Sequence, residues 1–126
     1  MEKVILSIVL VLAIIYMVPF LVYGLGSVVA GLKTPAGVSP KQFLMGVFVS
    51  KIGTALAFVL IFYLARSSLS GQWLLYALLW WLMFVFGEIG QAIEPNYSWK
   101  EGVAGVISET VYLPLSAWLV DWLIGK

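Results

Sequence analysis

The chain has 126 residues, of which 63% are hydrophobic and 10% are charged, and its formal net charge is +1. Soluble domains are about 45–50% apolar and about 25% charged, so this composition predicts a single integral membrane domain with lipid as its solvent. The small net charge argues against nucleic acid as a partner. There is no cysteine and no histidine, which removes disulfides, thiolate metal sites and the usual haem and transition-metal ligands. We therefore expect no cofactor, no bound metal and no enzymatic activity.

The first apolar segment predicts a transmembrane helix over residues 4–32. Its apolar run is longer than the core of a signal peptide, and no clear small-residue cleavage site follows it, so we expect the helix to be retained. Pro19 should kink this helix, because proline cannot donate to the backbone ladder. Small residues beyond the proline recur on one face, which favours close helix approach. They are Gly24, Ser27 and Gly31.

The second helix is predicted over residues 40–65, after a loop rich in proline, glycine and polar residues. Pro40 follows Ser39, a pattern typical of a capped helix start. Lys51 lies well inside the apolar run. A stripe of small residues at helical spacing is interpreted as a packing face, and consists of Gly46, Ser50, Gly53 and Ala57. Residues 67–72 are predicted to form a tight polar turn.

The third helix is predicted over residues 73–93 and ends before Pro95, since the residue before proline avoids helical geometry. Glu88 and Gln91 are three residues apart in this segment. Side chains at that spacing share one face of a helix. We expect both of them to face the interior of the bundle.

The fourth helix is predicted over residues 99–124. Ser98 and Glu101 form the spacing of a capping box at its start, and Pro114 should kink it. Glu109 and Thr110 interrupt the apolar run near its middle. A carboxylate in the middle of a membrane helix costs about 2.5–3.5 kcal/mol on insertion scales, so something must pair with Glu109, hydrate it or use it.

Four apolar segments joined by short links predict an all-α, four-helix up-down-up-down transmembrane bundle, kinked at Pro19 and Pro114, with both termini on one side. In that topology Lys51, Glu88 and Glu109 lie about 11, 6 and 10 residues from the same end of their helices. At about 1.5 Å per residue they would be roughly 9–17 Å deep, in the same half of the membrane.

Three interpretations of these charges remain open. Lys51 and Glu109 can form a buried ion pair that fixes helix register. Alternatively, Glu88 and Glu109 are exchangeable carboxylates of a substrate- or ion-binding site, with Lys51 holding their charge and Gln91 and Thr110 adding ligands. The third interpretation, a side chain that extends to the interface, fits Glu88 best.

The third and fourth segments also carry a resemblance to a family. The run LLWWLMF at residues 78–84, followed by YSWK at 97–100 and a final amphipathic span, resembles a group of small four-helix bacterial membrane proteins of unknown function. The resemblance implies the bundle topology and a prokaryotic cell membrane, and it carries over no functional residue.

Orientation in the membrane stays undecided, because the positive charges outside the bundle are balanced between the two sides. One side carries Lys3, Arg66 and Lys126, and the other carries Lys33, Lys41 and Lys100.

These features predict a small polytopic membrane protein that contributes to proton- or cation-coupled transport or to an ion pathway. Four helices are few to enclose a path, so this function implies a homo-oligomer. The alternative is a non-catalytic subunit or assembly factor of a larger membrane complex, with a membrane-protein partner. Small size, minimal loops and the small-residue stripes favour that alternative.

Overall fold

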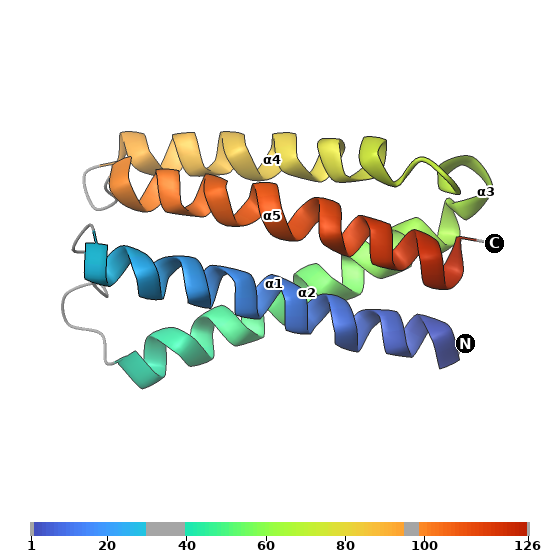
Figure 1. Cartoon of the computed structure of the whole chain (residues 1–126), viewed down its shortest axis with the longest axis horizontal. Coiled ribbons are helices and arrows are strands. Elements are labelled where there is room, and N and C mark those ends of the chain that lie inside the picture. The colour runs from blue at the N-terminus through green and yellow to red at the C-terminus, as the bar shows by residue number, and fades with distance from the viewer. Residues whose placement is uncertain (1, 30–39, 95–98, 126) are drawn as a thin grey trace.

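The computed structural model describes residues 2–29, 40–94 and 99–125, and every regular element within these ranges is helical (Figure 1). The long helices are α1 (Glu2–Val29), α2 (Pro40–Leu64), α4 (Trp73–Ile93) and α5 (Trp99–Ile124), and a single helical turn, α3, spans Arg66–Leu69. Each of the four long helices is long and apolar enough to cross a membrane. The N-terminal end of α1 and the C-terminal end of α5 lie at the same end of the molecule, together with α3 (Figure 1).

The connection between α2 and α4 differs from the polar turn predicted over residues 67–72. Ser68 N and Leu69 N both donate to Ala65 O, at 2.9 and 3.0 Å, so the chain first makes one more helical turn. The reversal itself falls at Gly71, whose φ of +77° lies in the left-handed region that glycine adopts without strain. The capping residue Ser98 and residues 30–32, predicted to end the first helix, lie outside the described residues.

Helix α5 is the centre of the packing. It contacts both α4 and α1, whereas α2 packs mainly against α1 (Figure 1). In the candidate membrane span of α5, 50% of the most apolar stretch is buried, against 11% of the corresponding stretch of α4. Small buried side chains explain this, because they let neighbouring helices approach closely. In α5 they are Gly102, Ala104, Gly105, Ser108, Ser116 and Ala117.

Aromatic side chains fill much of the space between α2, α4 and α5. Phe58 of α2 lies against Tyr76 and Trp80 of α4, with ring centroids 4.8 and 5.3 Å apart. The Tyr76 hydroxyl donates a hydrogen bond to the Phe58 carbonyl. This bond satisfies the polar atom of a buried tyrosine side chain. Trp80 in turn meets Phe84 edge-on at 5.7 Å, so the aromatic contacts continue toward the charged residues.

Helices α1 and α5 continue through Pro19 and Pro114 as single elements. The outer faces of the long helices carry many exposed apolar side chains, including Leu25, Leu64 and Phe86. An exposed apolar surface of this kind is what a lipid-embedded bundle presents to acyl chains.

Candidate functional site

Lys51 of α2 is half-buried, and its ammonium group lies against aromatic rings of two other helices. Its Nζ is 3.4 Å from the Tyr112 hydroxyl of α5, to which it donates a hydrogen bond. The same nitrogen lies 5.2 Å from the centroid of the Tyr112 ring and 6.0 Å from that of Phe84. Ring faces attract a cation through their quadrupole, so the aromatic wall partly replaces the water that Lys51 loses.

Glu109 of α5 is only 5% exposed. Its Oε1 atom has no hydrogen-bond partner among the described residues, which is uncommon for a buried polar atom. A buried oxygen without a partner raises the free energy of the folded state by about 1–3 kcal/mol. Glu109 is therefore a costly residue that its surroundings satisfy only in part.

Glu88 of α4 reaches across to α5 and meets Glu109. Its carboxyl group lies directly over Gly105, where the Cβ of any other residue would overlap it. The carboxyl groups of Glu88 and Glu109 are close neighbours. Gly105 precedes Glu109 by four residues, so both lie on the face of α5 that receives Glu88. The close approach of the two acids thus depends on a glycine at this position.

The structure does not support the first interpretation, an ion pair between Lys51 and Glu109, because no salt bridge joins these two residues. Both carboxylates still lie close enough to Lys51 to act on it electrostatically. The ammonium group instead contacts Tyr112, which follows Glu109 by three residues on the same helix. The site is therefore two acids in contact with each other, with one base nearby that pairs directly with a tyrosine.

Gln91 and Thr110 do not join this cluster. Gln91 is exposed on the outer surface of α4, which corrects the expectation that it faces the bundle. Thr110 is also exposed, and its Oγ1 donates to the Val106 carbonyl at 2.7 Å and accepts from Trp81 Nε1 at 2.9 Å. Its hydroxyl thus joins α4 to α5, and neither of these two hydrogen bonds involves an acid.

Three residues of the site were missed by the sequence analysis: Tyr112, Phe84 and Gly105. Tyr112 and Gly105 lie three residues after and four residues before Glu109, and Phe84 lies four residues before Glu88. These are the spacings of side chains on one helix face. Looking one turn to each side of the buried acids would have found all three.

A groove of about 260 Å³ lies between α4 and α5 beside the acids, with Glu88 in its lining. The rest of its lining is apolar. Ile89, Val103 and Ile107 are 39%, 56% and 51% exposed, so the groove opens on the outer surface of these helices. The groove surface is apolar throughout, so Glu88 contributes only carbon atoms to it, while its carboxyl group lies over Gly105.

Among the described residues, no group of three or more histidine, cysteine, aspartate or glutamate side chains is placed to hold a metal ion. Comparison of the chain with models of protein families, with curated proteins and with solved structures gave no match.

Proposed function

We propose that this chain is an integral membrane protein that takes up and releases a proton or a monovalent cation at Glu88 and Glu109, as part of coupled transport or an ion pathway. The supporting observation is the meeting of the half-buried Glu88 with the buried Glu109, which keeps an oxygen without a partner among the described residues. An ionisable residue inside a membrane span favours a role in an ion or substrate path.

The charges of the three groups suggest how such a site would work. Two carboxylates and one ammonium leave one negative charge, which a proton or a monovalent cation would balance. Adjacent carboxylates repel, so one proton shared between Glu88 and Glu109 stabilises their contact. When that proton leaves, the flexible Lys51 side chain can exchange its contact with Tyr112 for the carboxylates. Lys51 is thus the counter-charge of the state without the bound ion.

Access to the acids would require the Glu88 side chain to turn its carboxyl group into the groove between α4 and α5, whose apolar surface includes carbon atoms of Glu88. We infer that the long helices cross the membrane in an up-down-up-down order, with both termini on one side and bends at Pro19 and Pro114. Because four helices enclose little space, the transporting form is proposed to be a homo-oligomer. No enzymatic activity is proposed.

The test is ion flux in liposomes that contain the purified protein and a trapped pH indicator. Gradients of Na⁺ or K⁺ are applied across the membrane, and internal acidification or alkalinisation is followed. Glu88→Gln and Glu109→Gln should each lower the rate by at least about tenfold. The matched control is Glu94→Gln, an acid on the exposed surface outside the cluster, which should leave the rate within about twofold.

Gly105→Ala adds a variant that leaves every charged residue in place. The new methyl group would push the Glu88 carboxyl away from α5, and alanine itself favours a helix by about 1 kcal/mol over glycine. A stable Gly105→Ala protein with lowered flux would support a role for the contact between the two acids. Flux in wild-type liposomes no higher than in protein-free liposomes would reject the proposal.

A second function is favoured by one observation on α2. Gly46, Ser50 and Gly53 of the small-residue stripe are exposed, and a Cβ at either glycine would meet no atom within 4 Å. Another membrane helix could pack closely there. The chain would then be a non-catalytic subunit or assembly factor. A stoichiometric membrane protein retained through purification, and lost on Gly53→Leu, would favour this function.

A further inference from the structure

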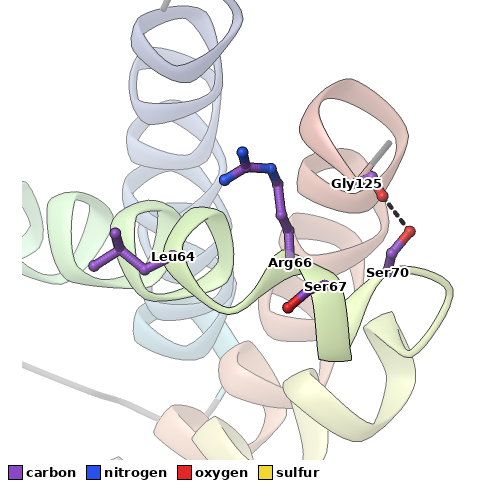
Figure 2. A pocket seen from close by; sticks show the side chains of 5 residues that line it. All are labelled: Leu64, Arg66, Ser67, Ser70 and Gly125. Atoms are coloured by element: carbon purple, nitrogen blue, oxygen red, sulfur yellow. Dashed lines mark hydrogen bonds between the residues drawn. The ribbon is translucent and has the colours of Figure 1, made fainter.

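A hollow of about 520 Å³ lies at the end of the molecule where both termini are found, far along α2 and α5 from the acids. It is lined by Leu64 at the end of α2, by Arg66, Ser67 and Ser70 of the connection to α4, and by Gly125 just after α5 (Figure 2). Segments more than 50 residues apart in sequence thus form one concave surface, held by the hydrogen bond from Ser70 Oγ to Gly125 O.

Arg66 is fixed in this hollow but keeps most of its hydrogen-bonding capacity. Its guanidinium carbon lies 4.1 Å from the centroid of the Tyr63 ring, and its Nη1 donates to the Tyr63 carbonyl at 2.6 Å. Within the described residues, this is the one hydrogen bond that the five N–H donors of Arg66 make. A guanidinium held on an aromatic ring, with donors still open, has the arrangement that favours binding of a phosphate.

The turn beside Arg66 is held in place by hydrogen bonds within the protein. The Asp121 carboxylate accepts hydrogen bonds from Gly71 N with both oxygens, at 3.1 and 3.2 Å, so this acid is already engaged by the turn. The exposed Ser67 hydroxyl makes no hydrogen bond within the described residues, and it offers a further donor in the lining. The hollow therefore combines a fixed cation with a free hydroxyl.

The position of the hollow indicates which phosphates it can meet. The apolar span of α2 covers Leu44–Leu64, and Leu64 is 80% exposed, so Arg66 lies two residues beyond the end of a candidate membrane span. Lipid phosphates lie at that level, just outside the hydrocarbon core. An acyl chain could run along Leu64 while its phosphate enters the hollow.

We propose that this hollow binds a phosphate group through Arg66, supplied by an anionic phospholipid of the adjacent leaflet or by a soluble phosphate. Ser67 contributes a hydrogen bond to the same ligand, and the Ser70–Gly125 contact keeps the two sides of the hollow together. This site is separate from the acid pair and does not depend on the proposed transport function.

The test is native mass spectrometry of the detergent-solubilised, delipidated protein. One arm is titrated with phosphatidylglycerol, and the other with inorganic phosphate. Saturable binding of one phosphatidylglycerol molecule is expected, and Arg66→Gln should raise its Kd by at least about tenfold. Lys3→Gln is the matched control, because Lys3 is an exposed cation in the first turn of α1, whose N-terminal end lies at this end of the molecule, and it does not line the hollow. It should change the Kd by less than about threefold.

Two further variants keep the test decisive if Arg66→Gln unfolds. Arg66→Lys retains the charge without the planar fork, and Ser67→Ala removes an exposed hydroxyl; both should weaken binding by about two- to tenfold. Saturation by inorganic phosphate that depends on Arg66 would support a soluble ligand in place of the lipid. Equal Kd values for the wild type, Arg66→Lys and Ser67→Ala, or equal losses in Lys3→Gln and Arg66→Gln, would overturn the proposal.

Discussion

Replacing Glu109 by methionine tests whether the buried acid contributes to the fold. Glu109 is 5% exposed and its Oε1 has no partner in the part of the chain that the structure describes. A polar group in that position costs about 1–3 kcal/mol, and methionine fills a similar volume without a polar atom. The attraction toward Lys51 and the contact with Glu88 are lost, but the repulsion between two neighbouring acids is relieved and no ion pair is broken. We therefore expect Glu109→Met to raise the free energy of unfolding by about 1–2 kcal/mol.

The measurement is reversible unfolding by SDS in mixed micelles, followed by the fluorescence of the six tryptophans and by circular dichroism. Lys51→Met and the double variant complete a thermodynamic cycle that isolates the coupling between the two residues. Glu94→Met serves as the control, because Glu94 is exposed and its replacement should change stability by less than about 0.5 kcal/mol.

One result would refute the reasoning. If Glu109→Met lowers the free energy of unfolding by about 3–5 kcal/mol and the double variant recovers most of that loss, the two residues behave as a buried ion pair. The charges would then hold the helices in register, and the search for function would move to partner proteins.

Three further predictions use the same unfolding assay. Ser116 is fully buried and its Oγ has no partner in the described residues, so Ser116→Ala should raise the free energy of unfolding by about 1 kcal/mol; a comparable loss would mean that the hydroxyl is satisfied. Asp121→Asn weakens the acceptor of Gly71 N and should lower stability by about 1 kcal/mol, with faster amide hydrogen exchange at Gly71; unchanged exchange would count against it. Trp81→Phe removes the hydrogen bond to Thr110 and should cost about 0.5–1.5 kcal/mol, whereas no change would show that this bond adds nothing.

The helices follow from a feature that the sequence states directly, since long apolar runs predict membrane helices. The small residues that bury α5 among its neighbours, such as Gly105 and Ser116, were not singled out from the sequence. The single helical turn at Arg66–Leu69 was not predicted, because a serine-rich segment usually indicates a turn. In the structure, the Ala65 carbonyl accepts hydrogen bonds from Ser68 N and Leu69 N, and these bonds form the helical turn.

The sequence predicted how far along each helix the site residues lie, but not which face of the helix they occupy. Counting residues places Glu88 and Glu109 in one half of the membrane, since each residue advances the helix by about 1.5 Å. Rotation by about 100° per residue turns Thr110 away from the face of Glu109, and it leaves Gln91 roughly 60° from Glu88, enough to reach the outer surface. Which face is buried depends on the neighbouring helices, and a single sequence does not state this.

The packing of α2 explains why Lys51 and Glu109 form no ion pair. This helix lies mainly against α1 and touches α5 little, so Lys51 approaches α5 from the edge and meets Tyr112 first. A pair that fixes helix register must be in contact, and Lys51 and Glu109 are not. The structural reason for keeping Glu109 is thereby weakened, while its cost, a buried oxygen without a partner in the described residues, remains. The proposed ion-exchanging site therefore rests on a costly buried acid that has a second acid as its neighbour.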